Sequence, residues 1–250
     1  MNSEPAACGD YVFSIFILRR LRSRQMVTFT KWIQQVDVAR HIRKQQEDLM
    51  ITAKDFFDDG LKLHGHKCPA MPLGLRAGAA AMNRLGINRT GDSEWLALVE
   101  LGDNHCATCF ADGIQMITGC TFGKGNIRKL DYGKWGLTLI DKKRGKAIRV
   151  VPRAEVMLAN KETDFFQTYR MKGIPPTKVP LEVVEPLVEK VMNAPEEQLL
   201  TVSDVFDHPY QEPSHSFSSF VCEECGEMVV EEYGRLKNGK KVCIPCTERK

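Results

Sequence analysis

The sequence has no membrane-length apolar segment, little excess charge, and no repeats or low-complexity tracts. The apolar run Tyr11–Leu18 has eight residues, whereas a helix that crosses a bilayer needs about 20. The formal net charge of +3 is too small to indicate nucleic-acid binding by itself, because phosphate recognition requires a concentrated basic face. We therefore expect no membrane association, and we do not favour nucleic acid as the main partner.

The even cysteine set of a secreted disulfide framework is also missing. There are nine cysteines, and all except Cys8 fall into two groups, one with histidines and one in CxxC pairs. Thiols grouped in this way usually bind metal in a reducing compartment. The composition therefore predicts a cytoplasmic metal-binding protein.

The first 27 residues do not have the charge order of a signal peptide. In a signal peptide the positive charges precede the apolar run, but here Arg19 and Arg20 follow it. We expect residues 1–27 to be a disordered or loosely attached extension, or Met1 to be an upstream start with Met26 as the working one.

Two cysteine pairs near the C-terminus have the spacing of a structural zinc site. Cys222 and Cys225 form one CxxC pair, Cys243 and Cys246 form the other, and 17 residues separate them. Each pair can chelate one Zn²⁺ from a tight turn. Residues 220–250 are thus predicted to be a four-cysteine zinc finger of the ribbon or treble-clef kind. Its basic residues are more typical of a solvated face than of a phosphate-binding surface.

The remaining chain predicts an α+β core domain at residues 28–206, joined to the zinc finger by a linker at 207–219. Helical and strand patterns are distinguished by their apolar periodicity, and glycine or proline marks their ends. The predicted helices are Thr30–Leu63, Leu73–Leu85, Cys109–Thr118, 161–173 and 180–193. The predicted strands are Trp95–Leu101, Leu137–Ile140, Ala147–Val151 and Val202–Phe206, of which the middle two form a hairpin.

A second group of metal-binding residue types lies in the core domain. His64, His66 and Cys68 fall within five positions of a predicted loop. Cys109 is predicted at the start of a helix, where free N–H groups and the helix dipole favour the thiolate. Cys106 makes a CxxC with Cys109, which could be a second chelating pair or a redox pair.

Three further residues near this group have more than one interpretation. Cys120 lies eleven residues after Cys109, roughly 16 Å along a straight helix, so it is either a ligand or a small buried apolar residue. Asp112 could orient a histidine ligand, act as a general base, or simply place charge near a helix start. The segment Gly119–Asn126 fails the Walker pattern, but Lys124 and its backbone N–H groups could bind an anion.

Two stretches together resemble the FmdE family, which takes its name from formylmethanofuran dehydrogenase. They are His64-Gly-His-Lys-Cys-Pro69 and the segment Cys109–Asn126, which contains Thr-Gly-Cys-Thr-Phe-Gly-Lys-Gly-Asn. The resemblance covers about residues 45–205, and the C-terminal pairs resemble the zinc finger that many members carry. It implies an α+β core, a homodimer, and association with a molybdenum or tungsten oxidoreductase complex. It also implies a metal or redox site, whose matching positions here are His64, His66, Cys68, Cys109, Asp112 and Cys120.

Three functions are consistent with these patterns. The first is a metal-binding protein, redox-active or accessory to a molybdenum or tungsten oxidoreductase, with zinc or another transition metal in the core and structural zinc at the C-terminus. Cys68, Cys109 and Asp112 are its candidate catalytic residues, and Lys124 its candidate cofactor-binding residue. The second is a regulator or adaptor whose zinc ribbon contacts nucleic acid or RNA polymerase and whose core senses a metal or metabolite. The third is a disulfide relay between Cys106 and Cys109.

Overall fold

The computed structural model describes residues 36, 50–89, 91–103, 105–214 and 217–248; of residues 105–107 it describes the backbone only. The expected N-terminal extension and most of the helical pattern that starts at Thr30 lie outside the described residues. Within the described part, no helix is long and apolar enough to cross a membrane.

A mixed six-stranded sheet forms the centre of the core domain. Its strand order is β2-β1-β3-β4-β5, with β6 also paired to β4. Only β1 and β2 run parallel, and the register pairs Ala97 of β1 with Leu139 of β3. The predicted hairpin is confirmed as β3 and β4, whereas the last predicted strand is divided into two short ones. The bounds are β1 Trp95–Val99, β2 Ile127–Lys129, β3 Leu137–Asp141, β4 Lys146–Pro152, β5 Leu200–Val202 and β6 Phe206–Asp207.

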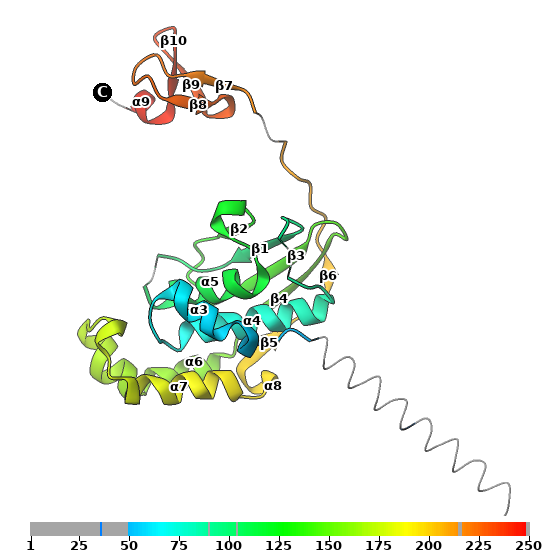
Figure 1. Ribbon diagram of the computed structural model, residues 1–250, viewed down its shortest axis with the longest axis vertical. Helices are drawn as coiled ribbons and strands as arrows, with labels where there is room; N and C mark the ends of the chain where they lie inside the picture. Colours follow the sequence, from blue (N-terminus) through cyan, green and yellow to red (C-terminus); the bar gives the residue numbers. More distant parts are fainter. Residues whose placement is uncertain (1–35, 37–49, 90, 104, 215–216, 249–250) are drawn as a thin grey trace, which may run out of the picture.

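Helices cover one face of this sheet. Helix α4 (Ala70–Leu85) packs on β3 and β4, and α5 (His105–Thr118) packs along α4 (Figure 1). Alternation along the strands sends Leu139, Ile148 and Val150 into this core, where they are fully buried. On the opposite face, Tyr210 covers a smaller apolar cluster. The fold is therefore α+β, as predicted.

Two glycines let the backbones of α4 and α5 approach each other closely. A Cβ added at Gly113 would lie 2.1 Å from the carbonyl oxygen of Met71, and one at Gly74 would lie 2.0 Å from that of Phe110. Both distances are far below van der Waals contact, so only glycine fits. Met71 follows Cys68 by three residues and Phe110 follows Cys109 by one, so this contact brings the chain beside the two sulfurs close together.

We expect Gly113→Ala to destabilise the core domain by about 1–3 kcal/mol or more, because an inserted methyl must push two backbones apart. Urea unfolding followed by tryptophan fluorescence measures the loss. Gly123→Ala is the control, since a Cβ there meets nothing within 4 Å. Equal stability of the two variants would contradict the close-contact interpretation.

Two helices begin earlier than the sequence patterns predicted. Helix α4 starts at Ala70 rather than at Leu73, because Pro72 lies in its first turn, where the missing proline N–H breaks no hydrogen bond. Helix α5 starts at His105 rather than at Cys109. The prediction that Cys109 occupies a helix start was therefore wrong.

The segment after β4 forms a second helical layer beside α4. Arg76 connects the two, because its guanidinium donates hydrogen bonds to the carbonyls of Val191, Met192 and Ala194 at 2.7–2.9 Å. This satisfies carbonyls at the end of α7, which otherwise have no intrahelical partner. Short helical segments replace the predicted helix 161–173. The bounds are α6 Ala154–Lys161, η3 Phe165–Tyr169, η4 Arg170–Lys172, η5 Pro176–Lys178, α7 Leu181–Asn193 and α8 Glu196–Leu199.

An ion pair between the buried Glu100 and the half-exposed Arg149 lies beside the end of β1. Both carboxylate oxygens of Glu100 accept hydrogen bonds from Arg149, at 2.6 and 2.7 Å. Gly136 leaves room for the carboxylate, because a Cβ there would lie 2.6 Å from it. The hydrogen bonds from Arg149 hold the pKa of Glu100 below its usual value.

Glu100→Gln is therefore expected to lower the free energy of unfolding at pH 7 by about 1–3 kcal/mol. Because the pKa of Glu100 is lower in the folded than in the unfolded chain, its full contribution to the free energy of unfolding is present above the unfolded pKa of about 4.3. That contribution is lost as the pH falls through the lower pKa of the folded chain. Urea titrations at pH 7 and pH 3 should thus show a difference that shrinks in acid. Glu155→Gln, at an exposed carboxylate, should change little at either pH.

The C-terminal module consists of two hairpins and a short helix. Asn238 and Gly239 connect β9 and β10 with φ of 52° and 77°, as an Asn-Gly hairpin turn requires. Three cysteines and Val242 form its buried cluster, and the half-buried Cys225 packs against it. The bounds are β7 Ser219–Val221, β8 Met228–Val230, η6 Glu231–Tyr233, β9 Gly234–Lys237, β10 Lys240–Cys243 and α9 Ile244–Glu248.

Candidate metal centre

The turn between α3 (Phe57–His64) and α4 brings two histidines and a cysteine toward α5. Gly65 ends α3 with φ of 84°, a conformation that favours glycine. His64, His66, Cys68 and Cys109 then each offer a donor atom, and these four atoms all lie within 4.8 Å of one another. Two imidazoles and two thiols at such distances could hold one transition-metal ion.

Asp112 orients His64 within this group. Its Oδ2 lies 2.8 Å from His64 Nδ1, and His64 Nε2 lies 3.4 Å from the sulfur of Cys68. Nδ1 therefore donates to the carboxylate, and Nε2 is directed at the other donor atoms. This is the usual arrangement in which a carboxylate sets the tautomer and ring orientation of a metal-binding histidine.

A chain of hydrogen bonds extends from Asp112 to the loop after α5. Gln115 Nε2 donates to Asp112 Oδ1 at 3.3 Å, and Gln115 Oε1 accepts from the backbone N–H of Phe122 at 3.2 Å. The Thr-Gly-Cys-Thr-Phe segment thus supports the carboxylate that supports His64. This hydrogen-bonding role gives the segment a structural function in the site, and it requires no bound anion.

The charges of the group differ from those predicted. The hydrogen bond from Cys109, followed by that from His64, lowers the pKa of Cys68 to about 4. Donation to Cys68, followed by burial, raises the pKa of Cys109. Hydrogen bonds to Asp112 and then to Cys68 raise the pKa of His64 to about 9. At neutral pH the thiolate therefore lies at Cys68 beside a protonated His64, and not at Cys109.

Asp112→Asn should weaken metal binding at the core group by about 10–100-fold, because the amide cannot supply the same negative charge or fix the His64 tautomer. Competition against a chromophoric zinc chelator measures the affinity of the core group after the C-terminal site is filled. Asp59→Asn, at an exposed carboxylate of α3 paired with Lys62, is the matched control. An unchanged affinity in Asp112→Asn would exclude this role.

The structure does not bring Cys120 into the group. Its side chain is fully buried, and its sulfur donates to the carbonyl oxygen of Trp95 at 3.6 Å. It lies past the opposite end of α5 from Cys109, as the spacing of eleven residues along a helix requires. Of its two interpretations, the geometry favours the small buried apolar residue. The side chains of His105 and Cys106 lie outside the described residues, so the disulfide relay stays a prediction.

Lys124 does not contribute to this group either. Its ammonium donates to the carbonyl oxygen of Gly91 at 3.4 Å. The nearby N–H groups that an anion would need are used inside the loop, because those of Lys124 and Gly125 bond to Thr121 and Phe122. The geometry therefore gives the predicted anion site no support.

The four C-terminal cysteines form a second compact group. The sulfurs of Cys222, Cys225, Cys243 and Cys246 all lie within 4.8 Å of one another. The backbone N–H of Cys243 donates to Cys222 at 3.3 Å, and the hydrogen bond from the Cys225 backbone is the main reason that the pKa of Cys222 falls to about 6. Four thiols of this kind fit a closed structural zinc site.

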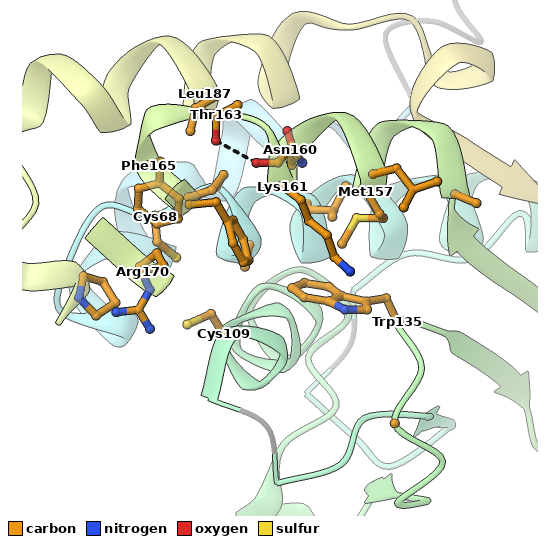
Figure 2. Close-up of a pocket in the computed structure, with 18 of the residues that line it drawn as sticks. Cys68, Cys109, Trp135, Met157, Asn160, Lys161, Thr163, Phe165, Arg170 and Leu187 are labelled. Carbon is orange, nitrogen blue, oxygen red and sulfur yellow. Dashed lines mark hydrogen bonds between the residues drawn. The ribbon is translucent and has the colours of Figure 1, made fainter. Parts of the chain in front are cut away.

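A cavity of about 570 Å³ opens beside the core group. Cys68 and Cys109 lie at one end of it, and Trp135, Met157 and Lys161 lie at the other (Figure 2). Its walls come from the start of α4, the loop before β3, and the segments α6 to α7. The sequence patterns missed this cavity, because no local signal marks residues that converge from such distant segments.

A mixed α+β domain with a His/Cys group, followed by a four-cysteine zinc-binding module, defines a metal-binding protein. The model of the FmdE family, described as molybdenum formylmethanofuran dehydrogenase operon, matches residues 63–201. The chain belongs to this family. A second model, the prokaryotic dksA/traR C4-type zinc finger, matches residues 215–250. The family resemblance that the sequence suggested is thereby confirmed.

Two similar proteins add to this assignment. A protein of Archaeoglobus fulgidus named as a probable S-adenosyl-L-methionine-binding protein is 32% identical over 208 residues, which cover 79% of this chain and 52% of the relative. The chain thus spans about half the length of that relative. The crystal structure of a tungsten formylmethanofuran dehydrogenase FmdE-like protein from Syntrophus aciditrophicus aligns with a TM-score of 0.56 at 21% identity. It covers 80% of this chain and 94% of that one, which shows a shared fold.

Proposed function

We propose that the core group binds zinc or another transition metal, and that the protein is redox-active or accessory to a molybdenum or tungsten formylmethanofuran-dehydrogenase-type oxidoreductase. One observation carries the metal assignment: four donor atoms within 4.8 Å of one another, two of them on thiols that line a cavity. A purely structural ion would need no such access.

The residues of the core group have distinct roles in this proposal. His64, His66, Cys68 and Cys109 hold the ion, and Asp112 positions His64 through Nδ1. A bound transition metal would supply Lewis acidity or, if redox-active, electron transfer. Burial of Cys68 and Cys109 limits the contact of their sulfurs with bulk solvent. Both residues line the cavity, through which a small molecule could reach them. We assign no ligand role to Cys120 or Lys124.

Support for the accessory role comes from the family and from the name of the Syntrophus protein, which refers to a tungsten enzyme. A tagged chain, captured anaerobically from its own cells, should bring molybdenum or tungsten with it, measured by elemental analysis. A Cys222→Ser chain tests whether the zinc module is needed for this association. If neither metal is enriched over an untagged control, the accessory role is excluded and metal binding by the core stands.

The archaeal relative's name makes S-adenosyl-L-methionine a candidate ligand of this chain. A homodimer and a cytoplasmic location also belong to the proposal, because the family resemblance and the cysteine usage favour them. Sedimentation of the purified chain tests the first, and fractionation of cells tests the second.

A regulator that acts through its zinc finger is the second candidate, favoured by the match to the dksA/traR finger. Nucleic-acid binding would have a steep dependence on salt, because basic side chains release counterions from phosphates. Titration of DNA with the full chain at about 50 and 200 mM salt tests it. Absence of binding at the lower salt would exclude direct nucleic-acid contact.

A further inference from the structure

The wall of the cavity beside the core group carries positive charge and no acidic side chain. Lys161 and Arg170 are among the residues that line it, and no Asp or Glu of the described chain is. The guanidinium of Arg170 also donates to the carbonyl oxygen of Ile174, which fixes its position in the wall. Most of the other lining side chains are apolar, so little else on the wall would compensate this charge.

Lys161 is the more accessible of the two cations. It is the last residue of α6, and its side chain extends toward Trp135 across the cavity (Figure 2). Among the residues that the structure describes, no carboxylate lies within 4.0 Å of its ammonium group. An ammonium group at the edge of an apolar cavity attracts an anion more strongly than one in bulk water.

Trp135 is held in place before any ligand arrives. Its neighbours Lys134 and Gly136 both hydrogen-bond to the backbone of Glu100, at 2.9 Å each. Phe110 contacts the indole in a T-shaped arrangement with ring centroids 5.8 Å apart. A rigid half-buried indole that lines a cavity offers a surface for an aromatic ring at little entropic cost.

We propose that this cavity binds a small planar aromatic anion, with its ring against Trp135 and its carboxylate or other acidic group paired with Lys161. The volume of about 570 Å³ lies within the range of small-molecule sites and suits a compound of two or three fused rings. Bound there, the ligand would lie between the indole and the sulfurs of Cys68 and Cys109.

This inference rests on the proposed metal centre in one respect. The core group lies at one end of the cavity, so its total charge adds to that of the wall. A divalent cation there would cancel the charge of two thiolates, which leaves the carboxylate of Asp112, 2.8 Å from His64 Nδ1, as the negative charge of the group. The cationic wall then determines which charge the ligand carries.

The test compares three ligands that share one ring system but differ in charge. Isothermal titration of the zinc-loaded full chain with 2-naphthoate, 2-naphthamide and 2-naphthylmethylammonium measures the charge preference. We expect the anion to bind about 10–100-fold more tightly than the amide, as a charge-assisted hydrogen bond implies, and the cation to bind most weakly. Lys161→Gln should abolish that preference, and Trp135→Leu should weaken anion and amide alike by about 2–10-fold.

Lys172→Gln is the control, because Lys172 is exposed in η4 and does not line the cavity. Equal binding of the three ligands, no binding, tighter binding of S-adenosyl-L-methionine, or a preference that survives Lys161→Gln would each overturn the inference. Zinc content is measured on the same samples. If the core holds zinc but the anion is not preferred, this inference is wrong and the proposed metal centre is unaffected. If the anion binds while the core holds no zinc, the proposed metal centre is wrong instead.

Discussion

Cys68→Ser is expected to carry one metal ion per chain where the parent carries two. The hydroxyl that replaces the sulfur is a poor ligand for a soft or borderline ion, and it removes the one group of the core that is already a thiolate at neutral pH, because the pKa of Cys68 is lowered by its hydrogen bonds. The lost ion should be the one bound by His64, His66 and Cys109. Elemental analysis after anaerobic purification under reducing conditions measures the stoichiometry.

Cys120→Ser is the matched control for this result. It changes the same atom in the same domain, but at a sulfur outside the core group that bonds to the carbonyl of Trp95. Two ions should therefore remain bound. If Cys68→Ser keeps both ions while Cys120→Ser loses one, the proposed ligand set is wrong. Two ions in both variants would show that Cys68 is not needed to hold the second ion, which contradicts its proposed role as a ligand.

Cys222→Ser is expected to unfold the C-terminal module while the core domain stays folded. The buried cluster of this module consists of Cys222, Val242, Cys243 and Cys246, so it has little apolar core apart from its cysteines. In modules of this size zinc binding supplies about 10–16 kcal/mol of folding free energy. Limited proteolysis should then remove the residues beyond 218 and leave a resistant core.

Glu224→Gln is the control within the same CxxC loop, because Glu224 pairs with Lys237 and provides no sulfur. Its module should resist protease as the parent does. A chelator added to the parent should reproduce the Cys222→Ser pattern. Resistance of the module in Cys222→Ser would show that zinc is not what holds it together.

The parts of the molecule that local sequence determines were predictable. The paired cysteines near the C-terminus lie within tight turns, so their spacing alone indicates zinc. The hairpin of β3 and β4 follows from two apolar strands around a charged turn. His64, His66 and Cys68 were predictable because they lie within five positions, at the end of α3 and in the turn after it. Cys109 was predictable because the family pattern adds it to them.

What the sequence could not determine depends on contacts between distant segments. The choice among the interpretations of Asp112 required its distance to His64, 48 residues away. The start of α5 at His105 moved Cys109 away from the helix end, so the dipole argument placed the thiolate on the wrong sulfur. Cys120 could be separated from the proposed ligands only when its burial and its bond to Trp95 were known. The cavity has no sequence signature, because several separate segments contribute to it.

The glycine contact between α4 and α5 has a consequence for how this protein can change over evolutionary time. Near Cys68 and Cys109 the main chains of α4 and α5 touch at Gly74 and Gly113. No larger residue fits at either glycine, so side-chain substitutions cannot change this backbone contact in small steps. If the core group binds an ion as we propose, a lineage that needs a larger ion cannot widen the site by single substitutions at this crossing. It would have to exchange the ligands themselves, so we expect homologues to differ in donor type before they differ in helix spacing.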